Sequence, residues 1–306
     1  MSNVPLRSQV HVDQLLSNVS VAYRNTRFIH DQAFPMVPVK KQSDLYRTYN
    51  RNWQIPNTRR AIGGLAREHQ FEIGTATYNL QKEALKSYVP DTAADNYDIT
   101  DLRADTTIEL TEKILMRKES DCAALFTTTS FSLGASLAAG DTWVTTTGNP
   151  IAQYDTAAAT IVGNSGVRPN YSILPLDSYN AAKNNAFVVD RVKYTSRDLG
   201  PGIIAALLGV GEILVPDMYF DSGLYGASAA TGAIQSIWKS DFAFLGYKPG
   251  APGFFALSSG YMFQRAKPLV RRWREEEREA DAIEVDCEYQ FKIVASLTGY
   301  YINNTF

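Results

Sequence analysis

The sequence is poor in several residue types that would point to a particular class of protein. Its 306 residues include only two cysteines and three histidines, and no stretch of 18 consecutive apolar residues. A disulfide framework, a histidine-rich metal site and a membrane-spanning helix are therefore not expected. The formal net charge of −2 argues against a dedicated nucleic-acid binder, which usually carries a basic face. Because a signal-peptide pattern is also absent, we expect a soluble protein that is made in the cytosol.

The motifs of common enzyme classes are missing too. The three histidines, His11, His30 and His69, are too far apart to form the i, i+4 pair of a helical metal site. The stretch 163–167 lacks the closing glycine of a nucleophile elbow, and no phosphate-binding Gly-x-x-x-x-Gly-Lys-Ser/Thr loop occurs. Residues 209–211 precede a predicted strand instead of following one, which is the wrong order for a dinucleotide site. We therefore expect no enzymatic activity, no metal and no cofactor.

What the sequence does contain is one unusually long alternating stretch near its end. From Ile283 to Leu297 every odd position is apolar, and the even positions are polar except for Val294. A period of two over fifteen residues predicts a β-strand with one buried and one solvated face. At roughly 3.3 Å per residue this strand would be about 50 Å long, well beyond an ordinary strand. Such a strand needs an equally long partner.

A helix of matching length is predicted over residues 100–126, with Thr100 or Asp101 as its cap. Its apolar residues recur at helical spacings and form one core-facing stripe. The stripe consists of Leu102, Ile108, Ile114, Leu115, Cys122, Leu125 and Phe126. At 1.5 Å per residue the helix would be roughly 40 Å long, so helix and strand together predict an elongated domain. Cys122 and Cys287 fall on predicted buried faces and are expected to be reduced core residues.

Two extended stretches predict a long two-stranded arm. Residues 45–53 alternate tyrosine and arginine, residues 70–78 form the second strand, and the connecting residues 54–68 are rich in glycine and arginine. Neither strand has enough apolar surface to be stable alone, so the arm needs a partner. The aromatic and basic residues from Tyr46 to Trp53 leave another interpretation open, a stacking platform for single-stranded nucleic acid.

The beginning of the chain also reads as an extended segment. Residues 1–30 are polar, and the few apolar residues between Leu15 and Tyr23 need cover from another surface. The prolines at 35 and 38 favour extended geometry from Phe34 to Val39. We therefore expect an N-terminal arm that lies over another part of the protein or of its assembly.

Residues 148–254 alternate helical and extended patterns, which predicts a small α/β domain inserted into the elongated one. One helix should start at Pro150 and end at Gly163, and two more should span 177–185 and 198–208. Short strands are expected at 143–145, 171–174, 212–215, 233–238, 242–245, 260–263 and 270–273.

Several short stretches, taken in order, are together similar to one known family. They are Phe34-Pro-Met-Val-Pro-Val-Lys-Lys41, Trp143, Asn149-Pro150, Arg168-Pro-Asn-Tyr-Ser-Ile-Leu174, Val189-Asp-Arg-Val-Lys-Tyr194, Ile213-Leu-Val215, Ile237-Trp238 and Phe242-Ala-Phe-Leu245. With the extended hairpin and the acidic turn into the long helix, they resemble a major capsid protein of tailed bacteriophages, with the α+β fold named for phage Hong Kong 97. The resemblance covers nearly the full chain from about residue 12.

This resemblance implies a division into four parts. Residues 1–40 would be the N-terminal arm, and residues 41–90 the extended loop that lies over a neighbouring subunit. Residues 91–147 and 255–306 would form the peripheral domain, which holds the spine helix and the long strand. Residues 148–254 would be the axial domain, which packs around five-fold and six-fold centres. Because the arm is short, a scaffold would be a separate protein or would be removed ahead of residue 1.

The implied function is that of a major capsid protein. Such a protein self-assembles as hexamers and pentamers into an icosahedral shell that encloses double-stranded DNA without reading its sequence. Its implied partners are further copies of itself and portal, scaffolding and cement proteins. No membrane partner is implied. The protein would assemble in the host cytoplasm and be located in the virion. Two alternatives stay open: an encapsulin-like bacterial compartment shell with the same fold, and the single-stranded nucleic-acid-binding protein considered above.

Charge predicts one contact between subunits. The tip of the arm carries three arginines, Arg59, Arg60 and Arg67. Like charges so concentrated repel one another unless something balances them. The densest acidic run elsewhere contains Glu275, Glu276, Glu277 and Glu279. We therefore expect the tip of one subunit to meet this acidic run on a neighbour.

Overall fold

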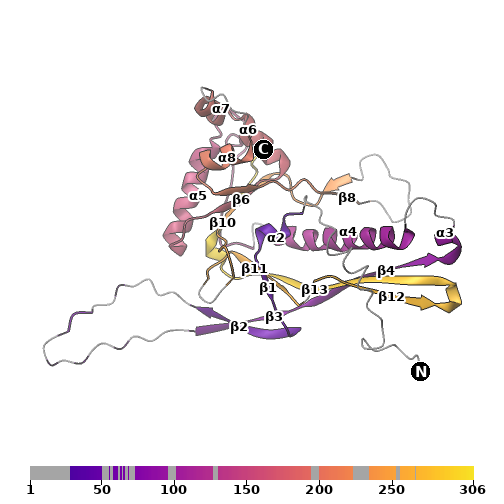
Figure 1. The fold of residues 1–306 in the computed structure, drawn as a ribbon. Coiled ribbons are helices and arrows are strands. Elements are labelled where there is room, and N and C mark those ends of the chain that lie inside the picture. Colours follow the sequence, from indigo (N-terminus) through magenta and orange to yellow (C-terminus); the bar gives the residue numbers. More distant parts are fainter. Residues whose placement is uncertain are drawn as a thin grey trace.

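The computed structural model combines helices with two five-stranded sheets and two two-stranded ones (Figure 1). This architecture confirms the predicted α+β class. The predicted arm up to residue 27 and most of the tip at 54–68 lie outside the described residues. The structure describes residues 28–49, 55, 58–60, 63, 65, 68, 73–95, 101–126, 130–193, 200–222, 234–252, 256–265 and 267–306.

The first sheet is built around β13 (Ala280–Ile293). This strand pairs antiparallel with β12 (Leu269–Glu275), with β11 (Gly260–Gln264) and, over ten residues, with β4 (Gln81–Pro90). β1 (Met36–Pro38), the predicted extended segment, continues the sheet by pairing parallel with β11. A strand held by three partners is fixed along its whole length.

The long strand is confirmed, with two differences from the prediction. It begins three residues earlier and ends at Ile293, after which the chain turns into the 3₁₀ helix η2 (Ser296–Thr298). Its odd positions from 283 to 291 are buried as predicted, but the face with the even positions is not simply solvated. Asp286 is only 3% exposed. Its charge can be buried because Lys82 on β4 and Arg271 on β12 pair with its carboxylate at 3.0 and 2.6 Å.

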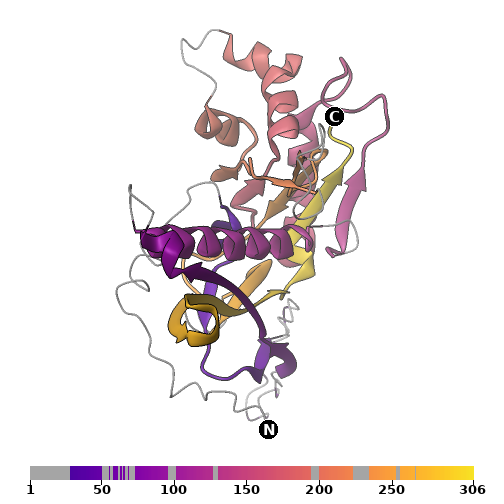
Figure 2. The same ribbon diagram turned by 90° about the vertical axis from the view of Figure 1, so that its right-hand side faces the viewer.

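The predicted helix is α4 (Leu102–Ala123), and the carboxylate of Asp101 caps it by accepting the Arg103 N–H at 3.0 Å. It lies along the first sheet (Figures 1 and 2). The buried apolar residues are Leu110, Ile114 and Cys122, whereas Ile108 and Leu115 are only half-buried. The predicted stripe is therefore displaced. The true face contains Thr107 and Thr111, whose hydroxyls donate to helix carbonyls and so can be buried.

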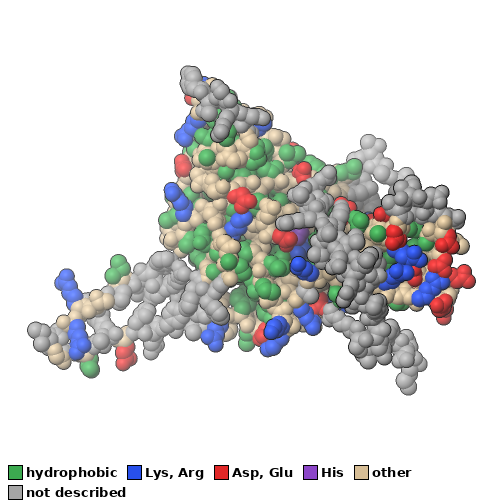
Figure 3. Space-filling model, viewed as in Figure 1, with side chains coloured by type: hydrophobic (Ala, Val, Ile, Leu, Met, Phe, Trp, Pro, Cys, Tyr) green, Lys and Arg blue, Asp and Glu red, His purple; other side chains and the backbone are tan. Residues whose placement is uncertain are grey.

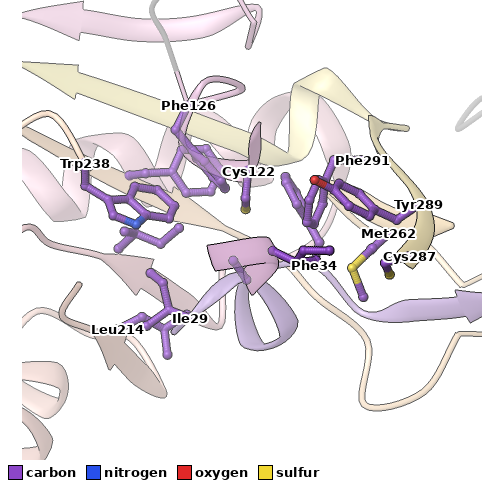
Figure 4. Close-up of a cluster of buried hydrophobic side chains, with 14 of the residues drawn as sticks. Ile29, Phe34, Cys122, Phe126, Leu214, Trp238, Met262, Cys287, Tyr289 and Phe291 are labelled. Carbon is purple, nitrogen blue, oxygen red and sulfur yellow. The ribbon is translucent and has the colours of Figure 1, made fainter. Parts of the chain in front are cut away.

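One aromatic-rich cluster joins the first sheet to the second (Figure 4). The Phe34 ring stacks on Phe126 with 5.2 Å between centroids, and Gly260 lets Phe34 approach β11, since a Cβ there would lie 2.4 Å from the ring. Cys122 and Cys287 are free and buried in this cluster, as predicted. Burial raises the pKa of the Cys287 thiol to about 11, so this thiol is a packing group.

The second sheet is centred on β10 (Phe242–Gly246), which lies between β14 (Gly299–Asn303) and β6 (Tyr171–Ile173). The edge strands β5 (Leu133–Ser136) and β7 (Glu212–Leu214) pair parallel with β14 and β6. Alternate β10 residues face opposite sides: the phenylalanines join the cluster shared with the first sheet, and the residues between them join a second core. Both faces of this sheet are therefore covered.

The helices α5 (Pro150–Ser165), α6 (Leu176–Asn184), α7 (Ala186–Val192) and α8 (Pro201–Leu207) cover the second core. In Figure 1, α6, α7 and α8 group at the end of the molecule away from β4 and β12. α5 begins at Pro150 as predicted but passes through Gly163. It ends where Gly166 adopts the left-handed conformation with φ of 68°.

Two other predictions in this region need comment. The strand expected at 143–145 is wrong, because these residues form turns, and the Trp143 indole instead donates to Gln153 on α5. β5 and α7 were not predicted. The strands expected at 171–174, 212–215, 233–238, 242–245, 260–263 and 270–273 are confirmed as β6, β7, β9 (Ile234–Ser236), β10, β11 and β12, with slightly different ends.

Candidate inter-subunit surfaces

The predicted arm is confirmed in the part that the structure describes, as the hairpin of β2 (Ser43–Tyr49) and β3 (Ile73–Asn79). Residues 50–53 and 70–72 of the predicted strands lie outside the described residues. The strands pair antiparallel from Ser43 opposite Asn79 to Tyr49 opposite Ile73. In Figure 1 this hairpin extends away from the rest of the molecule at one end. A hairpin of two strands is marginal in water by itself, so its stability depends on what packs against it.

The base of the hairpin is covered by its own chain, which corrects the expectation that it depends wholly on a partner. The Tyr78 ring stacks on Phe263 of β11 at 4.9 Å, and Tyr46 lies against the same ring at 5.4 Å. Leu80, at the junction with β4, is 1% exposed. These contacts give Tyr46 a packing role, which weakens its interpretation as part of a nucleic-acid stacking platform.

Farther out, the hairpin exposes apolar side chains together with its positive charge. Leu45 on β2 is 62% exposed, and Ile55 and Leu65 in the tip are each 96% exposed. Arg59 and Arg60 are exposed as well, whereas Arg67 lies outside the described residues. The sequence analysis considered only the charges of the tip. Ile55 and Leu65 could have been noticed there as apolar residues in a segment with no helical or strand pattern.

The predicted acidic run forms the turn between β12 and β13. Glu275 ends β12, residues Glu276–Arg278 form the 3₁₀ helix η1, and Glu279 adopts a left-handed conformation with φ of 44°. Glu276 and Glu277 are exposed, but Glu275 is only half-buried and so offers less of its side chain. The acidic surface at this turn is therefore carried mainly by Glu276, Glu277 and Glu279.

The basic residues of the same turn are used inside the subunit. Arg274 makes a bidentate pair with Asp91 of α3 (Asp91–Asp95), with N–O distances of 2.5 and 2.6 Å. Hydrogen bonding to this guanidinium lowers the pKa of the Asp91 carboxyl below its ordinary value. The Arg278 guanidinium lies 4.3 Å from the centroid of the Tyr88 ring. These contacts fix the turn. The Arg274 guanidinium also lies 3.8 Å from the carboxylate of Glu276, which stays 85% exposed.

The structure places the hairpin and the acidic turn at opposite ends of the first sheet. Figure 1 shows β2 and β3 at one end and the turn from β12 to β13 at the other, and Figure 3 shows charged side chains gathered over the turn. One chain therefore does not bring Arg59 and Arg60 near Glu276 and Glu277. A contact between these groups requires two copies.

Other kinds of site find little support in the described residues. There, no group of three or more His, Cys, Asp or Glu side chains is arranged to hold a metal ion. No helix among these residues is long and apolar enough to cross a membrane.

Solved structures share this combination of a long helix on a long strand, a hairpin and a second sheet. A phage-related protein from Bordetella bronchiseptica superposes with a TM-score of 0.76 at 22% identity, over 97% of this chain and 98% of that one. The capsid of cyanophage P-SCSP1u superposes with a TM-score of 0.63 at 9% identity, over 99% of this chain and 93% of that one. A virus-like particle from Pyrococcus furiosus superposes with a TM-score of 0.57 at 11% identity, over 94% of this chain and 96% of that one. The chain therefore has the fold of phage capsid proteins.

Sequence comparison also finds phage capsid proteins among the relatives of the chain. The chain is 27% identical over 209 residues to a major capsid protein of Pseudomonas phage JBD67, over 65% of this chain and 64% of that protein. It is 22% identical over 193 residues to a major capsid protein of Burkholderia phage BcepMu, which covers 61% of this chain and 62% of that protein. The alignments thus span less than two thirds of these curated relatives. No protein-family model matches the chain.

Proposed function

We propose that this chain is a major capsid protein. Copies of it assemble as hexamers and pentamers into an icosahedral shell that encloses the double-stranded DNA genome of a phage. The observation that carries this proposal is the projecting hairpin with its exposed apolar tip, on a chain that has the fold of phage capsid proteins. Apolar residues exposed to this extent are suited to cover by a neighbouring subunit.

The proposed assembly assigns a role to each part of the chain. Residues 1–40 are the N-terminal arm, and 41–90 the extended loop, whose last strand, β4, is already paired with β13. Residues 91–147 and 255–306 form the peripheral domain, and residues 148–254 form the axial domain. β14 pairs with β10 of the axial segment, and β5 pairs with β14, so by sheet membership both strands belong with the axial domain.

The role of the chain in this proposal is structural, without an enzymatic step. Its partners are further copies of itself, a portal, scaffolding and cement proteins, and packaged DNA that is held without sequence readout. The chain assembles in the host cytoplasm and stays in the capsid of the virion. The resemblance to named major capsid proteins supports this role.

We further propose that the hairpin tip of one subunit contacts the acidic turn of a neighbour. Arg59, Arg60 and Arg67 supply the positive charge, and Glu276 and Glu277, with Glu275 at the end of β12, supply the negative charge. A single exposed ion pair contributes little, about 0–1 kcal/mol. The same contact repeated by symmetry at every interface can still determine whether a shell closes.

Charge reversal tests this contact. Changing Arg59 and Arg60 to Glu should block assembly while leaving the circular dichroism of the subunit unchanged. Changing Glu276 and Glu277 to Arg in the same chain should partly restore assembly, as measured by sedimentation velocity. If the combined variant assembles no better than the arginine changes alone, the tip contacts a different surface.

Particle composition separates the capsid from its alternatives. Particles from the native source should sediment as closed shells and contain double-stranded DNA. Shells that contain protein cargo instead would favour an encapsulin-like compartment. Unassembled chains whose affinity for oligonucleotides falls steeply with salt would favour the single-stranded nucleic-acid binder.

A further inference from the structure

Glu119, on the sheet-facing side of α4, is a fully buried carboxylate with donors from two distant segments. It is 0% exposed. One oxygen accepts the backbone N–H groups of Ile29 at 3.2 Å and His30 at 3.0 Å, and the His30 Nδ1 lies 2.7 Å from it. The other oxygen accepts the Trp238 indole N–H at 2.7 Å. This carboxylate therefore joins the start of α2 (His30–Ala33) to the segment between β9 and β10.

The α2 segment, residues 28–34, is bound to the fold from other sides as well. The ammonium group of Lys118 lies 3.4 Å from Asp31 and donates to Gln264 of β11 at 3.2 Å. The ammonium group of Lys248 donates to the Gln32 carbonyl at 2.7 Å. Ile29 and Trp238 belong to the same buried cluster (Figure 4). The segment is thus tied to α4 and to the loop after β10, and Lys118 connects it to β11.

The geometry makes these contacts dependent on one another. A buried carboxylate is stable only while enough donors surround it. If the α2 segment left, Glu119 would lose its contacts with Ile29 and His30 and keep the single indole donor. Water would have to reach the carboxylate, and it could do so only if the contact with Trp238 loosened too. The carboxylate should therefore be either fully bound or released, with few stable states between.

We propose that Glu119 is a conformational latch, which makes the α2 segment and the segment around Trp238 open and close together. In the closed state the carboxylate holds all its donors. In the open state the α2 segment is detached and the carboxylate is hydrated. A force or partner that acts on the N-terminal segment is thereby transmitted to the chain between β9 and β10, and the reverse holds by linkage. This inference rests on geometry inside one chain and does not depend on the proposed function.

Hydrogen exchange on a matched pair of tryptophan variants tests the latch. Trp238→Phe removes the indole donor to Glu119 and keeps an aromatic side chain. Trp143→Phe makes the same change at a side chain that is also 1% exposed and also donates one indole hydrogen bond, but in the other core. In the full chain, Trp238→Phe should speed amide exchange in residues 28–34 by roughly tenfold, as expected for loss of a hydrogen bond to a charged group. Trp143→Phe should leave that exchange unchanged.

Two results would overturn the proposal. One is unchanged exchange in residues 28–34 of Trp238→Phe, and the other is equal acceleration by both variants, which would reflect general destabilisation. A measurement on the unmodified chain covers the case in which Trp238→Phe does not fold. At increasing subdenaturing concentrations of urea, residues 28–34 and 237–239 should share one opening free energy and one dependence on urea. Separate values for the two segments would contradict a common latch.

Discussion

At the scale of single residues, the junction of α4 with the first sheet depends on Asp281. One oxygen of its carboxylate accepts from Arg103 of α4 at 2.7 Å and from Arg272 of β12 at 2.8 Å. Burial alone would raise the pKa of Asp281, but the two guanidinium groups outweigh it and hold the pKa below its ordinary value. The ionised form is therefore the one that stabilises the fold.

This arrangement predicts a pH dependence at acid pH. Because the folded-state pKa of Asp281 is below the unfolded-state value of about 3.9, its stabilisation is present above about pH 4 and is lost as the pH falls through the folded-state pKa. Asp281→Asn should lower the free energy of unfolding at pH 7 by about 1–3 kcal/mol. Between pH 5 and pH 2, the free energy of unfolding of Asp281→Asn, measured with urea, should fall by less than that of the unmodified chain. Asp190→Asn, at an exposed position, is the control and should keep the acid sensitivity of the unmodified chain. If Asp281→Asn is as sensitive to acid as the unmodified chain, Asp281 does not have this role.

A second residue-scale prediction concerns Ile114, which is 2% exposed in the core between α4 and the first sheet. Ile114→Ala should leave a cavity and lower the free energy of unfolding by roughly 2–5 kcal/mol. Glu109→Ala removes only an exposed i, i+4 pair with Lys113 and should cost about 0.5 kcal/mol at most. Urea unfolding of the subunit measures both values. Similar values for the two variants would mean that α4 is not held by this face.

The sequence predicted the kind of residue in the core better than its exact position. Alternation identified the buried odd positions of β13 because a strand has only two faces. The helix face was less certain, since Thr107 and Thr111 read as polar although their hydroxyls bond to helix carbonyls. Glu119 and Lys118 could not be recognised as buried, because their partners come from residues 29–31, 238 and 264, far away in sequence.

At the scale of elements, the packing of the long helix α4 along the long strand β13 is the main structural feature. The helix has 22 residues and the strand 14, which correspond to about 33 Å and about 46 Å. Both lengths were readable from periodicity. β5, with four residues, and α7, with seven, were not predicted, because neither sequence shows a clear period and the conformation of both depends on neighbouring strands and helices.

The hairpin provides the prediction at this scale. Its base packs on Phe263, so removal of residues 54–68, with a Gly-Ser linker in their place, should leave a folded subunit. That subunit should not close shells, because the exposed tip residues Ile55 and Leu65 and the tip arginines are gone. Circular dichroism reports folding, and sedimentation velocity reports assembly. Normal shells from the shortened chain would exclude the tip from assembly.

At the scale of the whole molecule, the elongated first sheet separates two surfaces that have complementary features. The hairpin end presents exposed apolar and basic residues, and the turn between β12 and β13 presents exposed glutamates. Figure 1 shows these surfaces at opposite ends of one chain. Two different surfaces on one subunit generate head-to-tail contacts, and such contacts form a closed ring when the rotation between neighbours allows it.

The most direct test of this account is electron microscopy of the purified full chain expressed without any partner protein. If the chain is a major capsid protein with its assembly surfaces built in, the images should show closed shells made of rings with six-fold and five-fold symmetry. A chain that remains monomeric at every concentration and ionic strength tested, or that forms only open filaments, would contradict the central claim.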